Sequence, residues 1–322
     1  MNQPISPKVY VLYENPEWYE PVQKALNTRA IPNQGWNLAS GQVDINAEPP
    51  QGVFFNKMSA SSHTRGNLHA KHLTEAVLHW LEAHDRRIVN NSRVLQLEMS
   101  KAAQQVALQK HQLQTPKTIV THGITALLEA AQAFSPKPFI VKPNQGGKGL
   151  GVSLFNNVTE LENHLSLVEL QDWTVDGILL VQEYIPPHQQ RVIRMEFIGG
   201  KFFYAVQVDT GGGFELCPAD ACEIDPQNPG KAIPSFQIRP DFYIPEIQQC
   251  EDFLAANHIE IAGIEFLQDA EGNKYFYDVN TNTNYNTEAE AKLPGQKPGM
   301  EAVVDFLEKE YRKITTNGVL KV

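Results

Sequence analysis

A lysine followed by a dense glycine loop is the first feature of this sequence that could do chemistry. Lys142 ends the apolar run Phe139–Val141, and a second apolar run resumes at Val152–Phe155. The glycines between them are Gly146, Gly147, Gly149 and Gly151. Glycine lets the backbone adopt φ > 0 and bring its N–H groups close to an anion. The pattern therefore predicts a β-hairpin whose turn could bind a phosphate, the alternative being a plain glycine-rich turn.

The loop differs from the two commonest nucleotide-binding motifs. A Walker loop has Ser or Thr after its lysine and opens a helix, whereas Lys148 is followed by Gly149 and by residues typical of a strand. The dinucleotide fingerprint needs a third glycine, but Gly151 is followed by Val152-Ser153-Leu154. A phosphate site here therefore depends on partners elsewhere in the chain.

A second chemical signature consists of carboxylates on apolar strands. Glu265 lies within the apolar run 262–267, and Asp278 and Asn280 lie within 276–280. Buried carboxylates need charge partners. Because Asp278 and Asn280 are two residues apart, they project from one face of a strand and can converge with Glu265 on a hard cation. A salt-bridged sheet without a metal is the alternative.

Composition narrows the class of protein. The 322 residues suffice for two or three lobes with their own cores. The formal net charge of −10 argues against a nucleic-acid partner held by bulk electrostatics. No apolar run approaches the roughly 20 residues of a membrane span, and residues 1–7 lack the pattern of a signal peptide. We expect a cytoplasmic protein without a membrane partner.

Cysteine usage agrees with a reducing compartment. The three cysteines, Cys217, Cys222 and Cys250, are an odd and sparse set, so a disulfide framework is not expected. Cys217 and Cys222 are close in sequence, but a zinc site would need further ligands nearby, and the histidines are scattered.

The first 90 residues alternate between strand and helix patterns, which predicts an N-terminal α/β lobe. Strands are expected at 8–13, 52–56 and 87–90, helices at 18–26 and 69–84, and a loop at 31–41. The polar loop 59–65 follows the second strand, at the edge where open α/β sheets place ligand contacts. Its candidates for contact with a substrate carboxylate are Ser61, Ser62, His63, Thr64 and Arg65. A solvated loop is the alternative.

The rest of the chain predicts a helical segment followed by sheets of hairpins. One long helix is expected from Ser92 to Thr115-Pro116, with Lys101 in its middle; taken alone, Lys101 is an exposed helical lysine. Further strands are expected at 118–120, 177–185, 259–267 and 274–280, helices at 125–134, 160–168 and 244–257, and a hairpin at 191–207. The segment 209–239 is irregular and too long for an ordinary connection, which is typical of a substrate cover.

Taken in order, these motifs resemble the ATP-grasp superfamily, and most closely its branch of ribosomal-protein glutamate ligases and glutathione synthetase-like enzymes. The resemblance covers about Asn90 to Asn286. It rests on Ser100-Lys101, Val141-Lys142-Pro143, Gly146–Val152, Gln182–Ile185 and Asp278-Val279-Asn280.

The resemblance implies an α/β fold of the α+β ATP-grasp type. An N-terminal α/β lobe, residues 1–90, would precede two α+β lobes, residues 91–185 and 186–322, that clamp ATP between antiparallel sheets. The ATP-binding residues that it implies are Lys101, Lys142, Gly146, Gly147, Lys148, Gly149, Gln182, Glu183, Tyr184 and Ile185. Glu265, Asp278 and Asn280 match the Mg²⁺ ligands, with two ions expected and Mn²⁺ as an alternative.

The activity implied by the resemblance is ligation of a carboxylate to an amine. The γ-phosphoryl group of ATP would convert the carboxylate to an acylphosphate, which the amine then attacks. Arg194, which matches the family arginine facing the reacting carboxylate, and Lys142 would be the catalytic residues. The expected substrate is an amino acid or a peptide, and a homo-oligomer is left open. A small-molecule kinase on this fold, which the acidic net charge disfavours, and a non-catalytic nucleotide-binding protein are the alternatives.

The sequence departs from the family pattern in two places. The segment 209–222 replaces a basic stretch, so that Lys231 and Arg239 become candidates to complete the acylphosphate site. After Asn280 the sequence Thr281–Asn286 replaces the usual Pro/Gly loop. We therefore expect an unusual substrate pocket.

Overall fold

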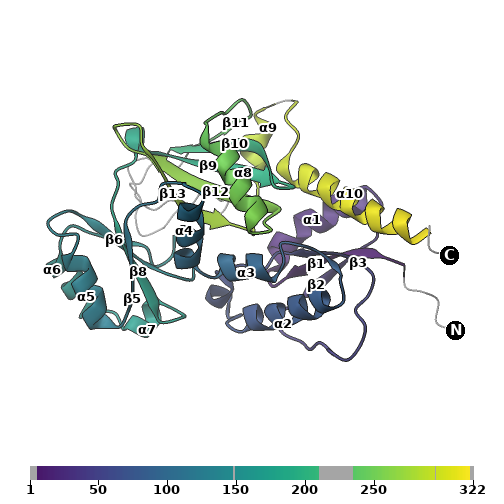
Figure 1. Cartoon of the computed structure of the whole chain (residues 1–322), viewed down its shortest axis with the longest axis horizontal. Coiled ribbons are helices and arrows are strands. Elements are labelled where there is room, and N and C mark those ends of the chain that lie inside the picture. Colours follow the sequence, from purple (N-terminus) through teal and green to yellow (C-terminus); the bar gives the residue numbers. More distant parts are fainter. Residues whose placement is uncertain (1–5, 148, 210–234, 294, 320–322) are drawn as a thin grey trace.

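The protein is described by a computed structural model, which covers residues 6–147, 149–209, 235–293 and 295–319. Three separate β-sheets dominate it (Figure 1). Along the long axis of the molecule, the sheet that is second in sequence, here called the middle sheet, lies at one end, the C-terminal sheet lies in the centre, and the N-terminal sheet lies toward the other end. No helix in these ranges is long and apolar enough to cross a membrane.

The N-terminal sheet is parallel, with strand order β2-β1-β3-β4. Its elements are β1 (Lys8–Tyr13), α1 (Pro16–Thr28), β2 (Asn33–Asn37), β3 (Gly52–Asn56), the 3₁₀ turn η1 (Ser62–Arg65), α2 (Ala70–Ala83) and β4 (Arg87–Val89). The expectation of a loop at 31–41 is wrong in part. Asn33–Asn37 contains a single apolar residue, Trp36, and forms a strand because β1 supplies its hydrogen-bonding partner.

The middle sheet is antiparallel, with strand order β5-β8-β6-β7. It comprises β5 (Thr118–His122), α5 (Ile124–Gln132), β6 (Phe139–Pro143), β7 (Ser153–Phe155), α6 (Val158–Leu165), α7 (Leu170–Trp173) and β8 (Ile178–Glu183). The predicted glycine hairpin is confirmed, because Phe139 pairs with Phe155 and Val141 with Ser153.

The C-terminal sheet is also antiparallel, with strand order β11-β10-β9-β12-β13. It contains η2 (His188–Gln190), β9 (Arg191–Ile198), β10 (Lys201–Asp209), β11 (Ser235–Arg239), α8 (Glu246–Ala256), β12 (Ile261–Gln268) and β13 (Lys274–Asn280). The expectation that all of 209–239 is irregular is wrong at its end, where β11 pairs with β10. Residues 210–234, with Cys217, Cys222 and Lys231, lie outside the described part of the chain.

The single long helix expected from Ser92 is two helices, α3 (Ser92–Glu98) and α4 (Lys101–Lys110). Ser100 causes the break: its backbone is extended, at φ −143° and ψ 103°, and its side chain accepts a hydrogen bond from Ala103 N, which makes it the N-cap of α4. Lys101 therefore begins α4 instead of lying in the middle of a helix.

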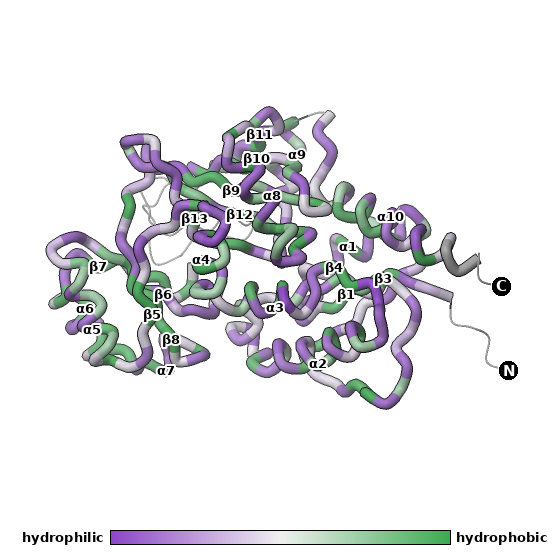
Figure 2. The backbone as a smooth tube through the Cα atoms, viewed as in Figure 1, coloured by the Kyte–Doolittle hydropathy of each residue, from purple (hydrophilic) through white to green (hydrophobic). Residues whose placement is uncertain are grey.

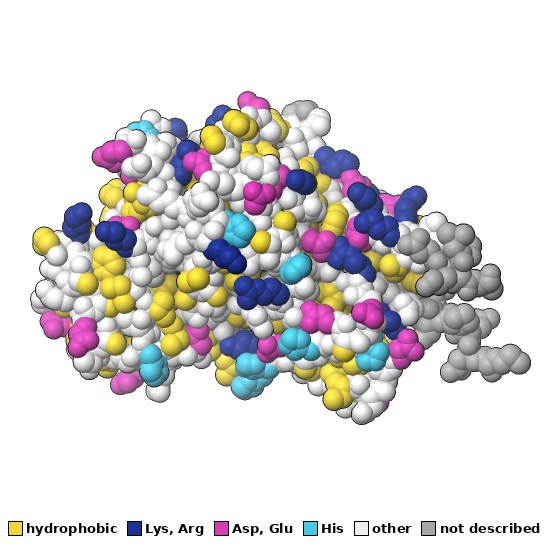
Figure 3. Space-filling view, viewed as in Figure 1, with side chains coloured by type: hydrophobic (Ala, Val, Ile, Leu, Met, Phe, Trp, Pro, Cys, Tyr) yellow, Lys and Arg dark blue, Asp and Glu magenta, His cyan; other side chains and the backbone are white. Residues whose placement is uncertain are grey.

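The last helix of the described chain packs against the N-terminal elements. After α9 (Thr287–Ala291), helix α10 (Gly299–Val319) packs against α1 and β3 (Figure 1). Arg29, which directly follows α1, forms an ion pair with Asp305, and Arg87 Nε donates to Glu310 Oε2 at 2.8 Å. Charges of both signs are interspersed over the face of the molecule that Figure 3 shows.

The middle sheet has an apolar core of its own. Leu127, Phe139, Phe155, Trp173 and Val181 form one buried cluster, whose members all lie between residues 127 and 181. The N-terminal sheet, the C-terminal sheet and α10 instead share a cluster, and hydrophobic stretches run through the strands of each sheet (Figure 2). Because it shares no buried core cluster with them, we treat the middle sheet as a unit that faces its neighbours across the site described next.

Candidate active site

One cleft lies where the three sheets meet, and it gathers most of the predicted site residues. The middle sheet and its loops contribute Lys142, Gly146, Gly147, Gly149 and Gln182–Ile185. The C-terminal sheet contributes Arg194, Glu265, Asp278 and Asn280, and α4 contributes Lys101. Lys148 lies outside the described residues. The sequence therefore located the cleft, although the roles of these residues stay predictions.

Strand register brings the carboxylates together. Glu265 on β12 lies directly opposite Asp278 on β13, and on its other side opposite Arg194 on β9. Asn280 Nδ2 donates to Glu265 Oε1 at 3.0 Å and to Asp278 Oδ2 at 3.3 Å. The three side chains thus converge, as the spacing on the strands predicts.

Two lysines face this group, Lys142 buried and Lys101 half-buried. Lys101 forms an ion pair with Asp278, and Lys142 Nζ donates to Gln182 Oε1 at 3.1 Å. The view of Lys101 as an exposed helical lysine is wrong, because its position at the start of α4 points it into the cleft. Burial and, to a smaller extent, the nearby charge of Lys101 lower the pKa of Lys142 to about 8.

The two carboxylates have opposite shifts. Burial raises the pKa of Glu265, and the negative charge of Asp278 adds to the effect. Burial would also raise the pKa of Asp278, but its ion pair with Lys101 outweighs burial and lowers it. Asp278 is thus the member of the pair that holds the negative charge most firmly.

Arg194 is buried and held on three sides. It donates to Glu196 Oε1 at 2.6 Å, Glu265 Oε1 at 3.1 Å and Thr283 Oγ1 at 2.6 Å. Burial would lower the pKa of Arg194, but the charges of Glu196 and Glu265 outweigh it and raise the pKa. Gly263 makes room for the guanidinium, since a Cβ there would lie 2.5 Å from Nε. Sequence reasoning missed the partners Glu196 and Thr283.

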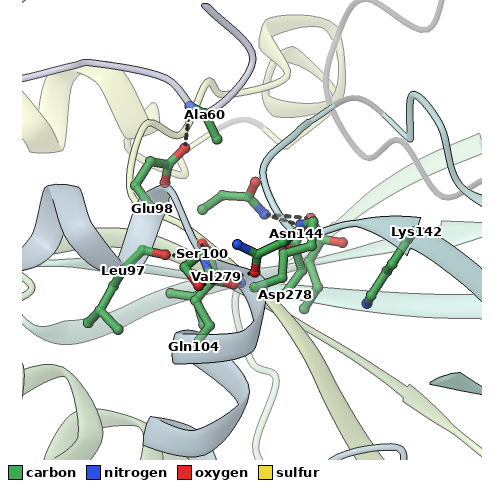
Figure 4. A network of polar contacts seen from close by, with 12 residues as sticks. Ala60, Leu97, Glu98, Ser100, Gln104, Lys142, Asn144, Asp278 and Val279 are labelled. Carbon is green, nitrogen blue, oxygen red and sulfur yellow. Dashed lines mark hydrogen bonds and ion pairs between the residues drawn. The ribbon is translucent and has the colours of Figure 1, made fainter. Parts of the chain in front are cut away.

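Two amide side chains outside the predicted set position the site (Figure 4). Gln104 of α4 bonds the backbone of Val279, between Asp278 and Asn280. Asn144, just before the glycine loop, accepts from Ala102 N through Oδ1 at 3.0 Å and from Lys101 N through its carbonyl at 3.1 Å. The loop and Lys101 are therefore tied together. A lone Gln or Asn in such positions gives no signal in a single sequence.

The end of β8 and the residues after it, 182–185, border an apolar part of the cleft. Glu183 ends β8, and its Oε1 accepts from Lys117 N at 2.6 Å, which fixes the side chain against the neighbouring strand. Ile140, Val152, Ile185 and Leu267 line this part of the cleft. A flat heterocycle fits between such apolar side chains, with hydrogen-bonding groups at the strand end.

The loop 59–65 is not the solvated loop of the alternative reading. Ser59, Ser61 and Ser62 are buried, and Ser59, Ala60 and Ser61 line the cleft. Arg65 instead pairs with Glu14 and stacks on the ring of Trp18, with Cζ 4.5 Å from the ring centre. His63 is not among the lining residues; burial lowers its pKa.

Glu98 of α3 connects this loop to the C-terminal sheet. It accepts from Ala60 N at 3.3 Å through one oxygen and from Thr281 N at 2.8 Å through the other. Burial raises the pKa of Glu98. This buried carboxylate was not predicted from the sequence, because it lies in an ordinary helical pattern.

The oxygen donors of the site fit a hard cation. No group of three or more His, Cys, Asp or Glu side chains suited to a metal occurs within the described ranges. Glu265, Asp278 and Asn280 together offer two carboxylates and one amide oxygen. Such an incomplete, all-oxygen set suits Mg²⁺, which keeps several waters and takes ligands from bound phosphates.

Comparison with known proteins identifies the class of this fold. Residues 99–215 match the RimK-like ATP-grasp domain family. Residues 99–215 are thus similar to a RimK-like ATP-grasp domain, and the chain has the ATP-grasp fold, as the order of its motifs predicted.

Individual relatives agree with this class. A probable α-L-glutamate ligase of Rhodopirellula baltica is 24% identical over 214 residues, which are 64% of this chain and 52% of the relative. The chain thus spans about half the length of that curated relative.

Solved structures with the same fold cover nearly the whole chain. The D-Ala:D-Ser ligase VanG of Enterococcus faecalis has a TM-score of 0.67 at 13% identity, covering 95% of this chain and 100% of that one. A RimK domain ATP-grasp protein of Sphaerobacter thermophilus has a TM-score of 0.62 at 15% identity, and the match covers 93% of this chain and 98% of that one. The ATP-grasp ligase PsnB, complexed with a minimal precursor, Mg and ADP, has a TM-score of 0.59 at 13% identity. That match covers 95% of this chain and 99% of PsnB.

Proposed function

We propose that this protein is an ATP- and Mg²⁺-dependent carboxylate–amine ligase that acts on an amino acid or a peptide. The observation that carries the proposal is the meeting of two lysines, a carboxylate pair and Arg194 in one cleft. This combination provides cations for a triphosphate, oxygen ligands for a metal and a guanidinium for a carboxylate. The ligases of the same fold support it, one of them with Mg and ADP bound.

The middle sheet would bind the nucleotide. Adenine would lie against Ile140, Val152 and Leu267, with Glu183–Ile185 supplying polar groups at its edge. Lys101 and Lys142 would bind the phosphates, and the glycine loop would cover them. Phosphate binding would give Lys142 a negatively charged partner in place of the neutral amide of Gln182, which favours the charged form of the lysine.

Glu265, Asp278 and Asn280 would hold Mg²⁺, and we propose two ions. The metal would supply positive charge for the oxygens that gain charge during phosphoryl transfer. For Asp278 to serve as a ligand, Lys101 must exchange its carboxylate partner for a phosphate, and the two groups are already in contact.

Arg194 and Lys142 would stabilise the reaction electrostatically. A carboxylate oxygen of the substrate attacks the γ-phosphorus, the bond to the β-phosphate oxygen breaks, and ADP leaves. The amine then attacks the carbonyl carbon of the acylphosphate, and phosphate leaves with the former carboxylate oxygen. Arg194, fixed by Glu196, would bind the oxygens on which negative charge develops in both steps.

The direct test is a search for coupled products. The protein is incubated with ATP, Mg²⁺ and pairs of amino acids and dipeptides, and ADP, phosphate and new amides are measured together. The proposal predicts one ADP and one phosphate for each amide formed. A stable phosphorylated product would instead identify a kinase, and the absence of ADP with every pair would identify a nucleotide-binding protein.

A further inference from the structure

The loop that follows β13, Thr281–Asn286, is fixed by hydrogen bonds at Thr281 and Thr283. Thr281 N and Oγ1 both donate to Glu98 at 2.8 Å. Thr283 Oγ1 donates to Glu196 at 2.8 Å, and the carbonyl of Thr283 accepts from Lys57 Nζ at 3.3 Å. The backbone on both sides of Asn282 is therefore held in place, and Asn282 is presented in a fixed position.

Asn282 differs from its neighbours Thr281 and Thr283. It lines the cleft together with Arg194 and Asp278, yet neither Nδ2 nor Oδ1 is exposed or has a hydrogen-bond partner in the described part of the chain. Two nearby asparagines do form hydrogen bonds: Asn280 Nδ2 donates to Glu265, and Asn286 caps α9. A buried amide that lacks both its donor and its acceptor bond is unfavourable, so such groups call for a partner.

The chemistry of the missing partner follows from the carboxamide itself. Asn282 offers a donor and an acceptor side by side, and another amide satisfies both at once. The chain contains this pairing: the carboxamide of Gln104 bonds both the N–H and the carbonyl of Val279, at 3.1 and 2.8 Å. We infer that Asn282 binds an amide group of the substrate, either a peptide bond or a side-chain carboxamide, close to the reacting carboxylate.

This inference rests on the proposed function, because it places the substrate beside Arg194. It narrows that function: a substrate with an amide should bind more tightly than the same molecule without one. Two matched pairs of probes test it, namely alanyl-alanine against L-alanine, and L-glutamine against L-glutamate.

The test is calorimetric titration of the full chain saturated with Mg²⁺ and a non-hydrolysable ATP analogue. At least one amide-bearing probe should bind about tenfold or more tightly than its counterpart, and Asn282→Ala should abolish that preference. A preference for alanyl-alanine identifies a peptide bond, and one for L-glutamine identifies a carboxamide. Asn163→Ala, the same change on the exposed face of α6, should retain the native preference.

Two results would overturn the inference: no preference for an amide in the native protein, or a preference that survives in Asn282→Ala. Thermal unfolding adds a second readout. Because the Asn282 carboxamide has no hydrogen-bond partner among the described residues, Asn282→Ala should leave the melting temperature of the unliganded protein unchanged or raise it, whereas a structural role would lower it. Failure to bind the ATP analogue would refute the proposed function itself, separately from the amide preference.

Discussion

The carboxamide of Gln104 pairs with the backbone of Val279, midway between Asp278 and Asn280. Gln104 Nε2 donates to Val279 O at 2.8 Å, and Val279 N donates to Gln104 Oε1 at 3.1 Å. β13 is the outer strand of its sheet, so its outward N–H and C=O groups need partners from elsewhere. Helix α4 supplies them through Gln104 and so fixes the strand that carries two proposed metal ligands.

Replacing Gln104 with Leu should destabilise the protein and weaken the site. The change leaves the N–H and C=O of Val279 buried without partners, at a cost of about 2 kcal/mol or more in the free energy of unfolding. Urea denaturation measures it. Gln248→Leu, on the exposed face of α8, is the matched control and should change stability by less than about 0.5 kcal/mol. Equal stability of the two variants would contradict the role given to Gln104.

Asp278→Asn should abolish turnover while the protein stays folded. The variant loses the carboxylate that holds its charge most firmly, so ATP turnover should fall by about 100-fold or more. The fold survives because the negative charge of Asp278 raises the pKa of Glu265, and its removal lets Glu265 ionise beside Lys101. Steady-state ADP release and circular dichroism measure the two effects. Asp252→Asn, exposed on α8, is the control; near-native turnover in Asp278→Asn would refute the metal site.

Gly263→Ala should displace Arg194. The added Cβ would lie 2.5 Å from Nε and 2.8 Å from Cζ of the guanidinium, which Glu196 holds in place. We expect turnover to fall by about 100-fold with little change in ATP affinity, and the unfolding free energy to fall by about 1–3 kcal/mol.

A double variant tests this clash. In an Arg194→Lys background no guanidinium is present, so Gly263→Ala should then cost little additional stability. Additive losses of stability in the double variant would show that the alanine acts on something other than Arg194.

Lys142 should lower the free energy of unfolding by an amount that changes with pH. Its pKa falls from 10.5 to about 8 on folding, so between these values the unfolded chain binds more protons and stability rises with pH. At neutral pH the buried charge therefore opposes folding, by about 3 kcal/mol for a shift of this size.

Lys142→Met should remove this effect. We expect the variant to be more stable than the native protein at about pH 7, and its advantage to shrink as the pH rises toward about 10. Urea denaturation at several pH values measures the difference, and Lys110→Met, at the exposed end of α4, is the control. A variant that is less stable than the native protein at neutral pH would contradict the account of Lys142.

Sequence patterns predicted the parts of this fold that repeat a local rule. The apolar runs on either side of the glycine loop formed the expected hairpin, and the two-residue spacing of Asp278 and Asn280 placed both beside Glu265. These features depend only on strand alternation, which a single sequence records. β2 was missed because the hydrogen bonds of β1, not its own composition, make it a strand.

The residues that organise the site could not be predicted, because their partners are distant in sequence. Gln104 and Val279 are 175 positions apart, and Asn144 reaches Ala102 across 42. In the sequence, the neighbours of Gln104 and Asn144 do not distinguish these two residues from ordinary surface residues. The break before Lys101 was missed for a related reason: the apolar period continues across it, and a single serine cap separates the helices.

The central claim is that a substrate carboxylate is activated by phosphorylation, and heavy-oxygen labelling tests it most directly. The carboxylate substrate that supports ADP release is labelled with ¹⁸O, and the released phosphate is analysed by mass spectrometry after turnover with ATP, Mg²⁺ and the amine. An acylphosphate predicts one ¹⁸O atom in each phosphate. Amide formation with unlabelled phosphate would contradict this account.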